Sequence, residues 1–257
     1  MEAGNDQREP LQSSVAVFPV PLEEAVHSAN REVLRNAASD PALTCDLALA
    51  LLKRADLPNE ILEEISKNRS LQKLRRVRLA LASHQRTPRH VSIPLVRQFY
   101  TFDLMKVALS PTVSADVKKT ADETLISRLK TITLGERLTL ARQASGRIAA
   151  ALLPDSEPRI MQAALENAHM TEAFIVQGVL KPQSAALVQA VSHHAKWSLR
   201  RDLQIALLRT EHLSLARALA FARNFSPVRL REILQNSRLP ARIKDQLLHE
   251  NPRSSRA

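Results

Sequence analysis

Two clusters of arginine and lysine are the side chains of this 257-residue chain best suited to chemistry, because they could hold phosphate or carboxylate groups. In the first cluster, nine basic residues lie between Glu64 and Asp103 without one acidic residue among them. Cations three or four residues apart on a helix share a face and present paired charges. The sequence therefore predicts a partner-binding or anion-binding surface formed by Lys73, Arg75, Arg76, Arg78, Arg89, Arg97, Lys196, Arg200, Arg201, Arg217 and Arg223.

The basic clusters have two interpretations. On stacked helices they would follow a phosphate backbone, as nucleic-acid-binding surfaces do. Alternatively, they form solvated helix faces or pair with carboxylates of neighbouring helices. The six Phe, one Tyr and one Trp leave few rings on which the bases of a single strand would stack, which weakens the first interpretation.

The other reactive residue types give no catalytic, cofactor or metal site. His193 and His194 are adjacent, and adjacent helical residues point about 100° apart, so they cannot share one ion in a continuous helix. Cys45 is the single cysteine and has no His nearby in the sequence that would activate it. Glu60, Glu63 and Glu64 fit the exposed first turns of a helix better than a catalytic pair. We expect no cofactor.

Composition narrows the class of protein. The chain carries 37 Lys+Arg and 26 Asp+Glu, for a net charge of +11. Residues 1–64 hold five basic and twelve acidic residues, whereas residues 65–257 hold 32 and 14. Such asymmetry favours an anionic partner, or an acidic end that contacts a basic body. No apolar run is long enough to span a membrane, and the N-terminal residues lack the pattern of a secretory signal, so we expect a cytoplasmic protein.

The elements that must position these residues are helices. The chain has 44% hydrophobic residues but only four glycines, too few for the many tight turns of a β-rich chain. Apolar periodicity and capping signals predict about sixteen short helices. Their expected ranges are 21–38, 44–54, 58–68, 70–83, 88–98, 103–109, 114–129, 133–144, 146–153, 157–167, 171–180, 184–194, 198–209, 214–223, 227–235 and 240–249.

The sequence also contains an internal repeat. Residues 58–121 align with residues 184–247 without gaps at an offset of 126, with nine identities that include Arg75/Arg201 and Arg97/Arg223. Self-similarity over many short helices is typical of a solenoid. We therefore expect a single α-solenoid domain over residues 21–250, with duplicated units at about 34–129 and 160–250, and tails at 1–20 and 251–257.

Several helix starts carry a family resemblance. Arg86-Thr87-Pro88 with Val91 and Leu95 is similar to the helix starts of leucine-rich repeat variant proteins. The segment from Leu152-Leu153-Pro154-Asp155 to Ala163-Ala164-Leu165 resembles a HEAT-type repeat, in which a Pro/Asp turn precedes a basic and apolar helix. The resemblance implies an α-α superhelix that serves as a binding surface. It implies no catalytic residues.

Together these features favour a non-enzymatic scaffold that binds a protein or peptide. The alternative is a nucleic-acid-binding solenoid that contacts phosphates through the two basic clusters. An enzyme similar to the HEAT-like alkylpurine DNA glycosylases is disfavoured, because those enzymes use a carboxylate flanked by several aromatic residues.

Overall fold

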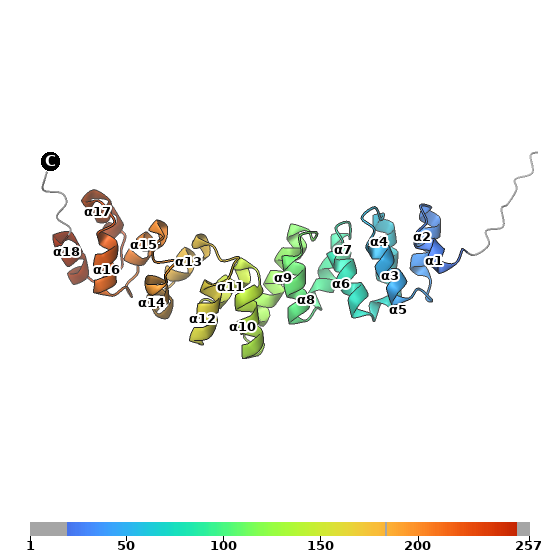
Figure 1. Cartoon of the computed structure of the whole chain (residues 1–257), viewed down its shortest axis with the longest axis horizontal. Helices are drawn as coiled ribbons and strands as arrows, with labels where there is room; N and C mark the ends of the chain where they lie inside the picture. Colours follow the sequence, from blue (N-terminus) through green and yellow to red (C-terminus); the bar gives the residue numbers. More distant parts are fainter. Residues whose placement is uncertain (1–19, 183, 251–257) are drawn as a thin grey trace, which may run out of the picture. The chain divides into compact units, whose positions relative to one another are not determined.

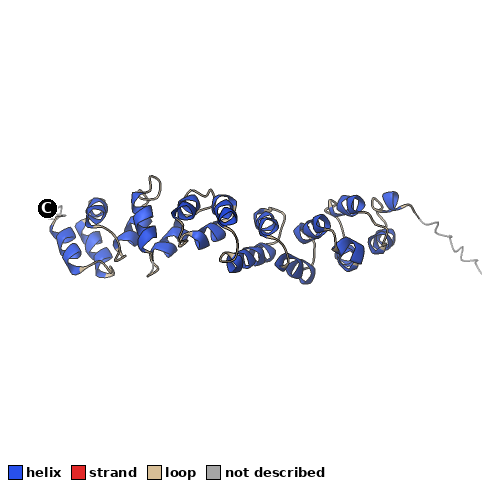
Figure 2. Cartoon of the chain, turned by 90° about the horizontal axis from the view of Figure 1, so that it is seen from below, coloured by secondary structure: helices blue, strands red, loops and turns tan. Residues whose placement is uncertain are grey.

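The computed structural model describes residues 20–182 and 184–250, and every regular element in these residues is a helix (Figure 2). The prediction of an all-α chain is confirmed. The tails predicted at 1–20 and 251–257 fall outside the described residues, apart from Val20. None of the described helices combines the length and hydrophobicity that crossing a membrane requires.

The chain divides into two compact units, unit 1 at residues 1–91 and unit 2 at residues 92–257. Figure 1 labels the helices of each unit. The boundary lies inside helix α7, within the span 21–250 that the sequence predicts as one domain. The helices up to this boundary are α1 (Leu22–Ala25), α2 (Arg31–Ser39), α3 (Cys45–Leu52), α4 (Asn59–Lys67), α5 (Arg69–Gln72), α6 (Arg75–Ser83) and α7 (Arg89–Arg97).

Unit 2 continues with helices of similar length. They are α8 (Thr101–Leu109), α9 (Ala115–Arg128), α10 (Leu134–Gln143), α11 (Gly146–Leu152), α12 (Pro158–Leu165), α13 (Glu172–Val179), α14 (Ala185–His193), α15 (Arg201–Leu208), α16 (Leu215–Ala222), α17 (Pro227–Gln235) and α18 (Ala241–His249). Buried Leu, Ile, Val and Ala side chains form the core.

Local capping explains several helix starts. Thr133 and Glu136 form a capping box at α10, in which each side chain accepts the backbone N–H of the other residue. The Ser226 hydroxyl accepts from the Arg229 N–H at 3.4 Å, with Pro227 in the first turn of α17. Pro58 precedes α4 as its N-cap.

Within the described residues there are two more helices than the expected sixteen, because two of the predicted helices are each divided in two. The range 21–38 breaks into α1 and α2, where the Asn30 side chain accepts from the Glu32 N–H at 2.9 Å and starts α2 anew. The range 70–83 breaks at Leu74, which has an extended backbone. In one continuous helix Leu71 and Val77 would lie about 120° apart. The break allows both to be buried.

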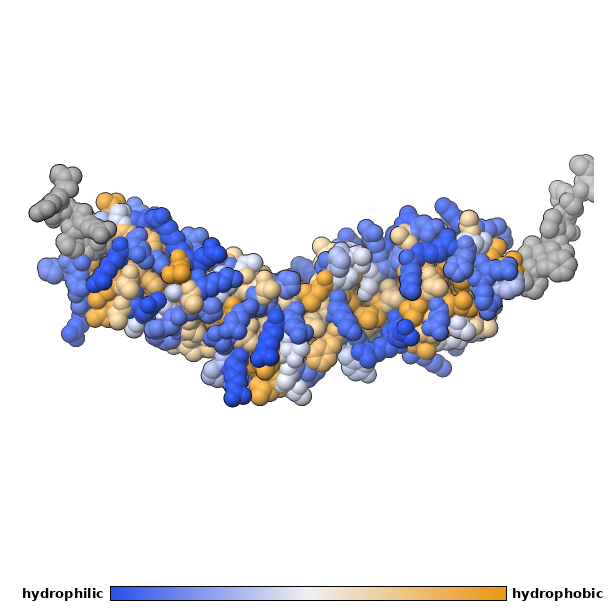
Figure 3. All heavy atoms as spheres, viewed as in Figure 1, coloured by the Kyte–Doolittle hydropathy of each residue, from blue (hydrophilic) through white to orange (hydrophobic). Residues whose placement is uncertain are grey.

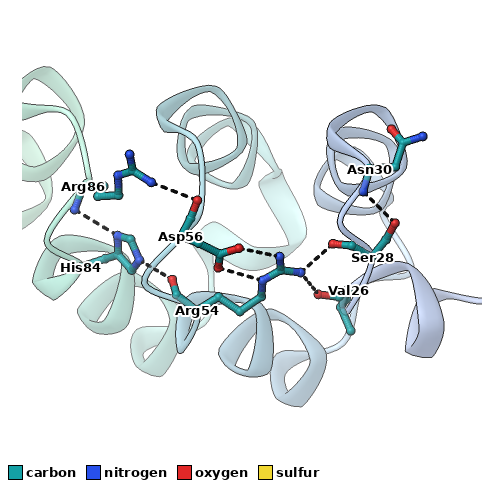
Figure 4. Close-up of polar contacts among 7 residues, drawn as sticks. All are labelled: Val26, Ser28, Asn30, Arg54, Asp56, His84 and Arg86. Carbon is teal, nitrogen blue, oxygen red and sulfur yellow. Dashed lines mark hydrogen bonds and ion pairs between the residues drawn. The ribbon is translucent and has the colours of Figure 1, made fainter.

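In unit 1, the side chain of Arg54 joins two inter-helix turns (Figure 4). Arg54 and its partner Val26 are 28 residues apart in the sequence. Arg54, which follows α3, donates through Nη1 to the carbonyls of Val26 and Ser28, at 3.1 and 2.8 Å. Its Nε and Nη2 bind the Asp56 carboxylate at 3.2 and 2.9 Å. This charge-assisted pairing holds the pKa of Asp56 below its usual range.

The next turn along unit 1 repeats the arrangement with different side chains (Figure 4). The Nε2 atom of His84 lies 2.9 Å from the carbonyl oxygen of Arg54, and Arg86 donates to the carbonyl of Asp56 at 3.0 Å. Carbonyls in the turns that follow α1 and α3 are thus satisfied by side chains from the following turn. These bonds fix the register of successive turns.

Within each unit the principal contacts of a helix are with the next helix or one of the following two. In unit 2, α9, α11, α13, α15 and α17 form one series of neighbours, and α10, α12 and α14 form another. In unit 1, α4 packs on α2, and α6 packs on α3. The order of helices along unit 2 is therefore also their order in space (Figure 1).

The offset of 126 residues also relates helix bounds. Helix α4 (Asn59–Lys67) corresponds to α14 (Ala185–His193), and α8 corresponds to α17 in the same way. Turn contacts correspond as well, since His212 Nε2 lies 3.2 Å from the carbonyl oxygen of Pro182, where unit 1 has the bond from Arg86 to Asp56. The duplication itself stays a prediction from the sequence.

Candidate partner-binding surfaces

The predicted basic residues of the first cluster lie on and around α6 and α7. Lys73 precedes α6, Arg75 and Arg76 lie in its first turn, and all three are exposed. Arg78 is half-buried and is less available to a partner. Arg89 and Arg97 are exposed residues at the two ends of α7, on either side of the boundary between the units.

The second cluster lies entirely in unit 2, where aromatic rings engage much of it. Lys196 Nζ lies 4.2 Å from the centre of the Trp197 ring, and the Arg201 guanidinium lies 5.6 Å from the centre of the Phe225 ring. Cation–π contacts of this kind hold a cation against the protein surface. Arg200 and Arg223 are exposed.

Arg217, the remaining residue of the second cluster, is built into the fold. Its guanidinium lies 4.8 Å from the centre of the Phe221 ring and donates to the carbonyl of Ser192 near the end of α14. The residue is half-buried. Arg217 therefore supports helix packing, and no local pattern of residues indicates its two partners.

The adjacent histidines have separate surroundings. His194 Nδ1 accepts the backbone N–H groups of Lys196 and Trp197, at 3.1 and 3.4 Å, and burial lowers the pKa of this ring. A neutral ring is required for a nitrogen that accepts. His193 is exposed. In the described parts of the chain, no three His, Cys, Asp or Glu side chains gather in a way that would hold a metal ion.

An apolar groove lies between α3 and α6 in unit 1. Its volume is about 530 Å³. Half-exposed apolar side chains line it from both helices, namely Leu49, Ala50, Leu79 and Ala80. A helix that packs on one face needs one apolar stripe, but α3 is apolar around most of its circumference. That excess is the sequence signal from which this groove could have been found.

Charged residues surround the same groove. Lys53 at the end of α3 and Arg76 on α6 are exposed and line it, and neither side chain makes a hydrogen bond or ion pair within the described residues. Asp46 lies at the other end of α3 and also lines the groove. Of the predicted site residues, Arg76 alone is among the residues that line this groove.

Comparisons of the chain with protein-family models, curated proteins and solved structures find no match. The resemblance to leucine-rich repeat variant and HEAT-type proteins therefore stays a prediction.

Unit 2 has a second apolar groove, of about 520 Å³, formed by α11 to α14. Leu153, Met161, Gly178 and Leu187 contribute its apolar lining. Over the face drawn in Figure 3, hydrophilic residues cover most helices and apolar residues form narrower strips among them.

Proposed function

We propose that the chain is a non-enzymatic binding scaffold, an α-solenoid that recognises a peptide segment of a partner protein. The packing of each helix on its near neighbours in sequence, within each unit, supports the solenoid. The recurring bonds between turns about 30 residues apart support a repeated structural unit of about that length. A cytoplasmic location stays a prediction.

The observation that carries this proposal is the groove between α3 and α6. Apolar side chains from two helices form a surface that one face of an amphipathic helix would cover, which is a common mode of peptide recognition. Lys53 and Arg76 add two cations without protein partners at its edge. The occupant that complements both properties is an amphipathic segment with apolar residues three or four positions apart and acidic residues beside them.

A random peptide library selected on the purified full chain tests this proposal. We expect the selected peptides to combine acidic residues with apolar residues at helical spacing. An A80E variant places bulk and a like charge in the groove, and should weaken binding of the selected peptides at least about tenfold in fluorescence anisotropy. An A55E variant, which makes the same change at an exposed turn of unit 1, should bind them as the unmodified chain does. Peptides that bind the A80E variant undiminished would contradict the groove as the site.

Nucleic-acid binding is the second candidate function. The stretch from Glu64 to Asp103 that lacks acidic residues favours it, together with the exposure of Lys73, Arg75 and Arg76. The engagement of Arg217 with Ser192 and Phe221 weakens it, because that cation is held inside unit 2.

Fluorescence anisotropy with duplex DNA over a salt series tests this second candidate. If about six phosphates are neutralised, the logarithm of the binding constant should fall with the logarithm of salt concentration with a slope near −5. Joint R75E and R201E substitutions should flatten the slope. An absence of binding at low salt would eliminate this candidate.

A further inference from the structure

A small cavity in unit 2 brings three turns together. It has a volume of about 210 Å³ and lies among the turns that follow α13, α15 and α17. Each turn contributes at least one basic residue to its lining, namely Lys181, Arg209 with His212, and Arg238. These residues span 58 positions of the sequence, which is why no local motif revealed the cavity.

Hydrogen bonds between the turns hold the cavity in place. His212 Nε2 lies 3.2 Å from the carbonyl oxygen of Pro182. The hydroxyl of Ser237 donates to the Leu208 carbonyl at 2.6 Å, and the N–H of Arg238 donates to the Arg209 carbonyl at 3.0 Å. When the residues that line a site are already held in place, less conformational entropy is lost on ligand binding, so binding is stronger.

The cations at this cavity are not neutralised by carboxylates. Within the described residues, Lys181, Arg209 and Arg238 form no ion pair, and the Nε atom of Arg209 is buried without a hydrogen-bond partner. Glu211, the acidic residue that lines the cavity, lies 3.4 Å from His212 Nε2. Three full positive charges therefore share the lining of the cavity with one carboxylate.

The stacking of the turns does not itself require these cations. The residues 126 positions earlier than Lys181, Arg209 and Arg238 are Ala55, Ser83 and Thr112, none of them basic. The corresponding turns of unit 1 nevertheless keep their bond from Arg86 to the Asp56 carbonyl. A cluster of like charges raises the free energy of the folded chain unless something offsets it. A bound anion would offset it here.

We propose that this cavity binds a phosphate group, either as the free ion or as the monoester of a small molecule. Its volume is below the roughly 300–1,000 Å³ of pockets for drug-sized ligands, so it suits a single small anion. The guanidinium groups of Arg209 and Arg238 match phosphate oxygens in pairs, and Lys181 adds a third charge. Asn236 and Thr210 supply further polar groups at the lining.

Isothermal titration calorimetry of the full chain at constant ionic strength tests the proposal, with inorganic phosphate and glycerol 2-phosphate as probes and chloride as the reference. We expect inorganic phosphate to bind with a dissociation constant on the order of 1 mM or below. Binding of both probes identifies a monoester site, and binding of inorganic phosphate alone identifies a site for the free ion. Heats no larger than those of chloride overturn the proposal.

A pair of double variants separates this site from general attraction to a basic protein. K181M with R238M removes two exposed cations at the cavity and should weaken phosphate binding at least about tenfold. K130M with R142M removes two exposed cations elsewhere in unit 2 and should leave binding within about twofold of the unmodified chain. Equal weakening by the two pairs, with far-UV circular dichroism unchanged, overturns the proposal.

Discussion

Replacing Trp197 by alanine is expected to lower the free energy of unfolding by about 3–5 kcal/mol. The side chain is 3% exposed, and its Nε1 donates to the carbonyl of Leu165 at the end of α12, at 2.8 Å. Alanine would leave a cavity and a buried carbonyl without its partner, and both effects destabilise the fold. Because the chain has no other Trp, urea unfolding of the variant should be followed by far-UV circular dichroism.

In unit 1, a different pair of residues fills the buried position and binds the carbonyls at the helix end. At the position 126 residues earlier stands Leu71, which is also buried, and Asn68 stands at the position of His194. The Asn68 amide donates to the carbonyl of Ala38 in the last turn of α2 and to that of Asp40 just after it, at 3.1 and 2.9 Å. One asparagine thus caps the end of α2, where an indole caps the end of α12.

Asn68 and the residue aligned with it, His194, also accept equivalent backbone hydrogen bonds. Asn68 Oδ1 accepts from the N–H groups of Ser70 and Leu71, as His194 Nδ1 accepts from those of Lys196 and Trp197. Asparagine both donates and accepts, so Asn68 alone performs two tasks that His194 and Trp197 share at the end of α12.

This equivalence predicts a rescue. A W197L variant should lose about 2–4 kcal/mol, since it keeps apolar volume but leaves the Leu165 carbonyl unpaired. Adding H194N should recover about 1 kcal/mol of that loss, because the new amide can donate where the indole did. The double variant would contradict the equivalence if it were less stable than W197L alone. In that case the role of Asn68 in unit 1 would not transfer.

Sequence reasoning predicted the helices far better than the surfaces. Caps such as Thr133 with Glu136 act within one turn, so local sequence contains all their partners. The alignment of Trp197 with Leu71 indicates a packing position, and both residues are buried. His194 aligns with Asn68, but a shared capping role between unlike side chains is visible only once their backbone partners are seen.

The surfaces depend on residues distant in sequence. Arg217 reads as an ordinary member of a basic cluster, and its bond to the Ser192 carbonyl depends on how α16 meets α14. The groove of unit 1 joins α3 to α6, which lie some 30 residues apart, and the cavity of unit 2 joins three turns. Periodicity assigns residues to the faces of one helix, but it does not determine which helices become neighbours.

Replacing Gly146 by alanine is expected to lower the free energy of unfolding by about 2–3 kcal/mol. A Cβ atom at this position would lie 2.3 Å from the carbonyl oxygen of His169 and 3.0 Å from Cε2 of Phe174. The first of these neighbours is backbone, which cannot move aside as the end of a side chain can. Gly146 begins α11, and its lack of a side chain allows the turn before α13 to approach this helix start.

Gly135 provides the matched control for this steric argument. No glycine within the described residues has a positive φ, so neither substitution strains the backbone dihedrals. A Cβ atom at Gly135 has nothing within 4 Å, and the residue lies in the first turn of α10. G135A should therefore raise the free energy of unfolding by roughly 0.5 kcal/mol through reduced freedom of the unfolded chain.

Trp197 lies in the same unit as both glycines, so its fluorescence can follow the unfolding of the G146A and G135A variants. Urea unfolding should give a midpoint for G146A well below that of the unmodified chain, and a midpoint for G135A at or slightly above it. Equal midpoints for the two variants would mean that α11 and the turn at His169 separate at little cost. The close approach would then contribute little to stability, and helix propensity alone would account for both substitutions.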